Sequence, residues 1–206
     1  DDTQLLAPLE QVDDNKSTHH CSLVVTTSEH ERQERHTARN SCHHVRMTHT
    51  VVALALPGVV AFDLSTAAQV FGHPDEHEYS FEVVTSDGRQ VPSSTGFQIA
   101  GAGDPSSLRQ ADTIVIPGYS PHTTPSDDVL EALRSAHSRG TRVVSICTGA
   151  FALAPTGLLD GLSATTHWQD AEELHTTYPA VDVTPDVLYI DHGHVASSAG
   201  VAAGID

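Results

Sequence analysis

The chain has 206 residues, enough for one α/β domain with a sizeable core but too few for two large domains. Twenty-seven acidic residues stand against 10 basic ones, a formal net charge of -17, which argues against direct binding to a phosphate backbone because such binding needs clustered Lys and Arg. No apolar run approaches the roughly 20 residues of a membrane span, and no charged-then-apolar signal segment opens the chain. The three cysteines lack paired spacing, so a reduced, cytoplasmic setting is predicted.

Residues 1–46 differ in composition from the rest of the chain, being polar and mixed in charge. Their small apolar surface cannot offset the entropy that ordering a chain costs, so we predict that this segment is disordered. Its two histidine pairs, at 19–20 and 43–44, lack the spacing of a tetrahedral metal site, and no metal site is predicted. Met47 stands immediately before the first convincing strand, so we hypothesise that it is the native start of a domain over residues 47–206.

The domain is predicted to open with a strand and a helix. Residues 50–56 are nearly all apolar and rich in Val and Leu, as in a central strand that is buried on both faces. A helix follows near Leu64, with its apolar positions on one face and Gly72 just past its end. Asp63 precedes this helix, where it can be an N-cap that accepts a backbone N–H or can face a crevice; the two interpretations stand equal.

Three further strands are predicted next. Residues 81–86 read as the second strand, and an Asp-Gly turn signal leads from it into a short return strand at residues 90–91. Residues 93–104, dense in Ser, Gly and Ala, form a connection of no defined type. Residues 112–116 make a third buried strand, which a Pro-Gly pair closes at Gly118.

A second helix is predicted to open at Thr124. Thr124 can supply the N-cap, Pro125 suits the first turn, and Asp127 can return the capping bond. Gly140 ends the helix. One apolar face collects Val129, Leu130, Leu133 and Ala136. The repeated order of strand, helix and strand predicts a parallel sheet covered by helices on both faces.

Residues 143–159 are typical of a buried strand that turns sharply into a helix at Cys147. Such a turn exposes one side chain. Ligands of open α/β sheets sit beyond the carboxyl ends of the strands, so Cys147 is predicted at the floor of a crevice. The N–H groups that open the following helix would favour a thiolate or an anionic ligand there.

The last part of the chain is predicted to contain short elements. Short strands at residues 163–165 and 181–184 flank a helix at residues 169–178. Strands at residues 187–191 and 194–197 are joined by a His-Gly turn as a hairpin.

The region around Cys147 resembles the nucleophile elbow of the ThiJ/PfpI superfamily, which has the class I glutamine amidotransferase-like fold. Within that superfamily the chain is most similar to the N-terminal sensor domain of AraC-type transcription regulators of the GlxA kind. The segments that carry the resemblance are residues 62–64, 115–118, 145–159, 164–168, 186–191 and 198–206. The resemblance covers roughly Thr50 to Asp206 and implies a flavodoxin-like three-layer α/β sandwich with a mostly parallel central sheet.

The resemblance also implies a set of site residues. In the superfamily an acidic residue at the place of Asp63 faces the cysteine, and the amide at the place of Gly118 helps to hold an oxyanion or a ligand carboxylate. The implied ligand-binding residues are Asp63, Gly118, Tyr119, Cys147, Thr148 and His167. No cofactor is implied.

Two residues depart from the catalytic pattern of the superfamily. Its hydrolase-like branch carries a His directly after the cysteine, and this chain has Thr148 there, which argues against a protease or amidase. His167 is the nearest candidate base, but a histidine beside an aromatic residue is more often packed than catalytic. Cys147 itself can equally be a small buried apolar residue.

The resemblance implies a ligand-sensing, dimerising domain of a transcription regulator. Its partners would be a small-molecule effector and a second copy of the chain, and DNA would be bound only through a C-terminal helix-turn-helix part absent from these 206 residues, which are therefore interpreted as a fragment. The alternative is a stand-alone enzyme such as an isonitrile hydratase, with Cys147 and Asp63 catalytic. The stretches at residues 187–193 and 197–200 look more like the regulator branch.

Overall fold

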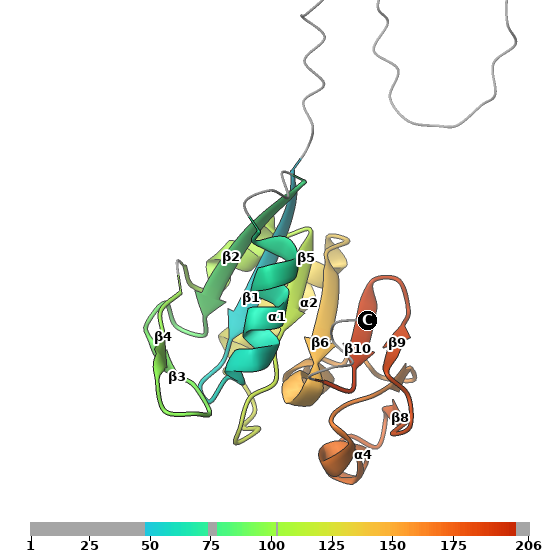
Figure 1. Cartoon of the computed structure of the whole chain (residues 1–206). Coiled ribbons are helices and arrows are strands. Elements are labelled where there is room, and N and C mark those ends of the chain that lie inside the picture. Colours follow the sequence, from blue (N-terminus) through green and yellow to red (C-terminus); the bar gives the residue numbers. More distant parts are fainter. Residues whose placement is uncertain (1–47, 74–77, 102, 201–206) are drawn as a thin grey trace, which may run out of the picture. The chain divides into compact units, whose positions relative to one another are not determined.

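The computed structural model describes residues 48–73, 78–101 and 103–200 (Figure 1). The predicted disorder of residues 1–46 and the proposed start at Met47 lie outside the described residues, as does most of the closing stretch at residues 198–206. No helix within the described part is both long and apolar enough to cross a bilayer.

A six-stranded sheet forms the centre of the domain, in the order β2-β1-β5-β6-β10-β9 (Figure 1). Its strands are β1 His49–Ala55, β2 Tyr79–Thr85, β5 Thr113–Ile116, β6 Arg142–Ile146, β9 Tyr189–Asp191 and β10 Val195–Ser198. All neighbouring strands run parallel except β9 and β10, which form an antiparallel hairpin at one edge. The predicted mostly parallel sheet and the predicted hairpin are both confirmed.

Helices cover both faces of this sheet because the strands are apolar on both faces. In β1, Val52 belongs to the same buried cluster as Leu133 of helix α2, Asp127–Ser138. The next residue back, Val51, packs in a separate cluster with Ala67 of helix α1, Ala61–Phe71. Successive residues of a strand point to opposite faces, so α1 and α2 lie on opposite sides of the sheet, as Figure 1 shows. The predicted three-layer α/β sandwich is confirmed.

The structure corrects both predicted helix starts. Helix α1 begins at Ala61 with Val60 as its N-cap, so Asp63 lies inside the first turn and does not cap the helix. Helix α2 begins at Asp127 with Ser126 as its N-cap, and Thr124 plays no part in capping. The physical reason in the second case is that the preceding residues belong to a loop, in which the Tyr119 hydroxyl donates to the Thr123 carbonyl at 3.0 Å.

The predicted return strand after β2 is also corrected. Residues 91–92 form β3, Val91–Pro92, which pairs with β4, Gln98–Ile99, and not with β2. A local turn decides this pairing, because the Ser93 N–H donates to the Phe97 carbonyl at 2.7 Å and the Phe97 N–H donates back to Ser93 Oγ at 3.1 Å. A 3₁₀ helix, η4 Pro105–Gln110, then leads into β5.

The helix predicted after Cys147 is broken into short turns: η5 Cys147–Gly149, α3 Ala150–Leu153 and η6 Ala154–Thr156. Pro155 accounts for the last break, since a proline cannot donate its backbone nitrogen to a helix. The remaining elements are β7 Ser163–Ala164, η7 Trp168–Asp170, α4 Ala171–Thr177 and β8 Asp182–Val183, and β7 pairs with β8 in parallel.

We expect Leu133→Ala to destabilise the domain by about 2–5 kcal/mol, because Leu133 is fully buried between α2 and the sheet. Leu188→Ala is the matched control, since that side chain is 56% exposed and its loss should change stability by no more than about 0.5 kcal/mol. Urea unfolding followed by circular dichroism measures both. Equal losses in the two variants would contradict the assignment of the core.

Candidate functional site

Cys147 occupies a sharp elbow directly after β6. Its φ of 56° is positive, a conformation that costs a side chain about 1–2 kcal/mol, and among the described residues no other non-glycine residue has one. The elbow is held from two sides: Thr166 Oγ1 donates to the Cys147 carbonyl at 2.8 Å, and Gly149 packs so closely on the Ile116 carbonyl that a side chain there would collide with it. The strained turn is therefore fixed by its neighbours.

Gly118, at the end of β5, is the point around which the site gathers. A Cβ atom on Gly118 would lie 2.6 Å from Asp63 Oδ2 and 3.0 Å from both Cys147 Cβ and Thr148 Oγ1. Only a glycine permits this approach. The Gly118 N–H donates to Asp63 Oδ2 at 3.2 Å, and Asp63 is completely buried. The carboxylate, the thiol and the Thr148 hydroxyl are thus neighbours.

Gly200 closes the site from the far end of the chain, and the sequence analysis did not single it out. A Cβ atom on Gly200 would lie 2.7 Å from Cys147 Sγ, and its φ of +97° also favours glycine. Its main chain therefore lies against the thiol, and Cys147 keeps only 6% of its surface exposed. The Ser-Ser-Ala sequence at residues 197–199 before it gave no local signal of this contact.

Thr148 ties β6 to the loop after β5. Its hydroxyl accepts a hydrogen bond from the Tyr119 N–H and donates one to the Tyr119 carbonyl, both at 2.9 Å. Tyr119 is 1% exposed. The residue that follows the cysteine is therefore engaged with main-chain groups, and it has no acid–base function of the kind a histidine would supply there.

Burial raises the pKa of the Cys147 thiol to about 11, and the negative charge of Asp63 adds to this effect. A hydrogen bond from the Thr148 backbone opposes the rise but does not cancel it. The prediction that the following helix would favour a thiolate is therefore wrong. The interrupted helix supplies a short dipole, and the desolvation of the thiolate outweighs it.

The structure brings together Asp63, Gly118, Tyr119, Cys147 and Thr148 of the expected site residues. His167 is occupied differently: its Nδ1 lies 3.2 Å from Asp170 Oδ2, and its ring is only half-buried. The neighbouring Trp168 is 70% exposed, so the aromatic contact predicted for His167 lies at the surface.

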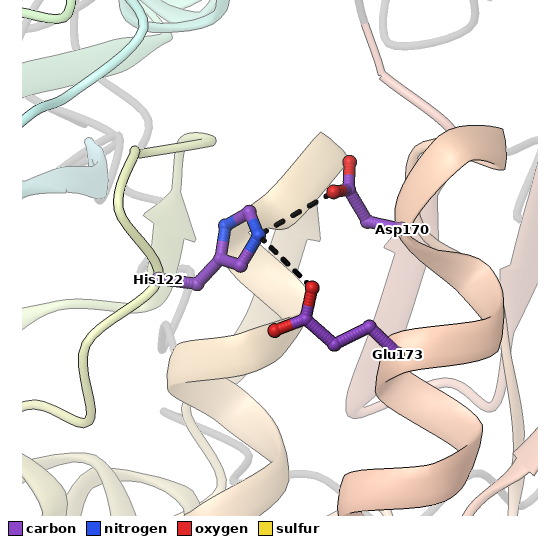
Figure 2. A group of neighbouring side chains, drawn as sticks. All are labelled: His122, Asp170 and Glu173. Carbon is purple, nitrogen blue, oxygen red and sulfur yellow. Dashed lines mark ion pairs between the residues drawn. The ribbon is translucent and has the colours of Figure 1, made fainter.

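The described side chains that could together hold a metal ion lie beside this site. They are His122, Asp170 and Glu173, whose ligand atoms all fall within 4.8 Å of one another (Figure 2). Asp170 also contributes to the raised pKa of Cys147, which shows that the two groups lie within electrostatic reach.

Several known proteins are similar to this chain. An uncharacterised protein in the cpoL 5' region of Streptomyces lividans is 37% identical over 136 residues, which are 64% of this chain and 96% of that protein. The HTH-type transcriptional regulator CdhR of Pseudomonas aeruginosa is 31% identical over 126 residues, 61% of this chain. The chain spans only 38% of the length of CdhR.

An enzyme is also among the similar proteins. The isonitrile hydratase of Pseudomonas putida is 32% identical over 156 residues, which are 74% of this chain and 66% of the enzyme. Among solved structures, a ThiJ/PfpI family protein from Pseudomonas syringae shares the fold with a TM-score of 0.67 at 23% identity, over 77% of this chain and 65% of that chain. The sequence matches the DJ-1/PfpI family over residues 49–206, and the chain belongs to that family.

Proposed function

We propose that this chain is the ligand-sensing, dimerising domain of a transcription regulator, with a small molecule bound in the crevice at Cys147. The similarity to the regulators CdhR, GbdR and GlxA, at 29–31% identity, supports this role. DNA would be bound by a separate helix-turn-helix part of the regulator. A chain with a net charge of -17 is suited to carry the sensor and not the DNA contact.

The observation that carries the proposal is how the elbow uses Thr148. The hydrolase-like branch of the superfamily carries a histidine directly after the cysteine, and here the Thr148 hydroxyl at that position is hydrogen-bonded to both main-chain polar groups of Tyr119. A thiol with a pKa of about 11 is protonated at neutral pH, so it is a poor resting nucleophile. Both features suit a site that binds without reacting.

The loop held by Thr148 also borders a place for a ligand. A hollow of about 250 Å³ lies beyond the ends of β1 and β2 and is lined by Leu56, Pro57, Ser86, Asp87, Tyr119 and residues 123–126. This is the carboxyl edge of the sheet, where open α/β folds bind small molecules. A ligand in this hollow would contact Tyr119. Because the Tyr119 main chain is hydrogen-bonded to the Thr148 hydroxyl, a movement of Tyr119 would also move Thr148 at the elbow.

The regulator proposal is tested with the complete gene product, immunoprecipitated from its own cells with bound DNA. We expect discrete chromosomal sites for the complete product and none for the 206-residue chain, because this chain lacks the clustered cations that phosphates require. A gel-shift assay on the recovered sites provides the control for both proteins. Absence of any enriched site for the complete product would contradict the proposal.

A second candidate function has one observation in its favour. Asp63 lies next to Cys147 around Gly118, as a general acid–base partner for a nucleophilic thiol would. In an isonitrile hydratase the sulfur would add to the isonitrile carbon, which takes up a proton to give a thioimidate. Water would then add to that carbon and release the thiol, leaving an N-substituted formamide. The chain therefore needs a direct assay for this reaction.

We expect no turnover of cyclohexyl isocyanide above the buffer rate, because the thiol is protonated and its Thr148 neighbour supplies no base. N-cyclohexylformamide is measured by gas chromatography over a range of pH. If the native chain forms it, Cys147→Ala and Asp63→Asn should abolish the activity, whereas Cys42→Ala should not. That pattern would establish the enzyme and overturn the sensing role.

We expect iodoacetamide to modify Cys147 about 100-fold more slowly at pH 8 than an ordinary thiol, since a pKa of about 11 instead of 9.0 lowers the thiolate fraction by that factor. The rate should rise with each pH unit up to about 11. Peptide mass spectrometry separates this cysteine from Cys21 and Cys42.

The same assay tests how much the neighbouring carboxylates raise the pKa of Cys147. Asp63→Asn should lower this pKa and speed alkylation. Asp170→Asn should have a smaller effect, because Asp170 raises the pKa of the thiol less than Asp63 does. Asp160→Asn is the control and should leave the rate unchanged. A rate that Asp63→Asn fails to raise would show that burial alone controls the thiol.

A further inference from the structure

Three potential metal ligands meet where the loop after β5 faces the start of α4 (Figure 2). The loop supplies His122. Asp170 is the last residue of η7 and the N-cap of α4, and Glu173 lies three residues later in the first turn of α4, so both carboxylates stand at the start of this helix. His122 Nε2 lies 3.4 Å from Asp170 Oδ1 and 3.8 Å from Glu173 Oε2. The figure shows both carboxylates directed at this one nitrogen.

The His122 ring is oriented so that Nε2 can reach a metal ion. Its Nδ1 lies 3.2 Å from the Tyr119 carbonyl, and because a carbonyl only accepts, Nδ1 is the donor in this contact. Nε2 is then the ring nitrogen left for a metal ion, and it faces the carboxylates. The ring is also stacked on Phe151, with centroids 4.3 Å apart and an 18° interplanar angle. Metal-ligating histidines commonly have such a hydrogen bond from the second ring nitrogen, here to the Tyr119 carbonyl.

Asp170 is held in a similar way. Its Oδ2 pairs with His167 Nδ1 at 3.2 Å, which leaves Oδ1 as the oxygen nearest His122. Glu173 is 61% exposed in its side chain, so it can adjust its position at little cost. One ligand histidine and one carboxylate are thus prepositioned, and the third group is adaptable.

The distances are compatible with a metal site. A charge-assisted N–H···O hydrogen bond brings its heavy atoms to roughly 2.7–2.9 Å, whereas the His122 contacts are 3.4 and 3.8 Å. Two ligands each about 2.1 Å from a tetrahedral Zn²⁺ lie roughly 3.4 Å apart. The contact of His122 with Asp170 matches this spacing, and the ligand atoms of all three groups lie within 4.8 Å of one another.

We propose that His122, Asp170 and Glu173 bind a divalent transition metal ion, with Zn²⁺ as the best fit. An imidazole with two carboxylates suits Zn²⁺ better than Mg²⁺, which prefers oxygen ligands in octahedral geometry. Three protein ligands leave a fourth position for water or for a donor atom of a small molecule. This assignment goes beyond the proposed sensing role, and it departs from the sequence analysis, which expected no metal site.

A bound ion would join two parts of the domain that the sheet does not connect directly. His122 belongs to the loop whose Tyr119 main chain is bonded to Thr148 at the elbow. Asp170 and Glu173 belong to the helix segment that follows His167. The ion would therefore fix this loop against α4 next to Cys147.

The test is calorimetric titration of ZnCl₂ into the EDTA-treated, dialysed 206-residue chain. We expect His122→Ala and Glu173→Gln to weaken one class of Zn²⁺ binding by at least roughly 10- to 100-fold, the range seen when even the supporting partners of a ligand are removed. Glu172→Gln and His175→Ala are matched controls on the same helix, both exposed and outside the cluster. Histidines before residue 48 are identical in all variants, so they cancel in the comparison.

Thermal unfolding gives a second measurement. Zn²⁺ should raise the Tm of the native chain and of the two controls, and should raise it less in Glu173→Gln, an exposed substitution that leaves the core intact. MgCl₂ at equal concentration should produce a smaller rise. If His122→Ala and Glu173→Gln bind Zn²⁺ as tightly as the controls, the cluster is an ion pair only and the proposal is overturned.

Discussion

The structure of the site depends on one constraint, which is the close approach of the ends of β5 and β6. Gly118 lacks a side chain, so Asp63, Cys147 and Thr148 can surround its Cα atom. The Thr148 hydroxyl then bridges both main-chain polar groups of Tyr119. The position of the elbow and the path of the loop after β5 are therefore one structural feature.

Desolvation decides what this feature can do chemically. Gly200 lies against the thiol, and the fully buried carboxylate of Asp63 stands next to it, so the neutral form of Cys147 is strongly preferred. A thiol in its neutral form is a weak nucleophile, although the elbow that presents it is held firmly in place. The same loop carries His122 toward the acidic start of α4. This loop therefore connects the elbow, the hollow at Tyr119 and the carboxylates of Asp170 and Glu173.

The fold was largely predictable because it rests on local patterns. The apolar strands at residues 50–56 and 143–146 specify a sheet buried on both faces, and the spacing of Leu130 and Leu133 specifies one face of α2. The start of α2 was mispredicted because Thr124 looks like a cap in the sequence, whereas it lies in a loop in which the Tyr119 hydroxyl donates to the Thr123 carbonyl, and Ser126 is the N-cap. The short β3 strand pairs locally because hydrogen bonds between Ser93 and Phe97 close the turn between β3 and β4.

The sequence by itself determined the elbow, since an apolar run ending in Cys-Thr-Gly is a local signal, and it determined Asp63 and Gly118 only through resemblance. The tertiary structure alone decided the protonation of Cys147, the contact of Gly200 with the thiol and the meeting of His122 with Asp170 and Glu173. Each of these three features depends on burial or on contact between residues far apart in the chain. Local periodicity does not reveal burial or such contacts, because they exist only once the sheet has brought its loops together.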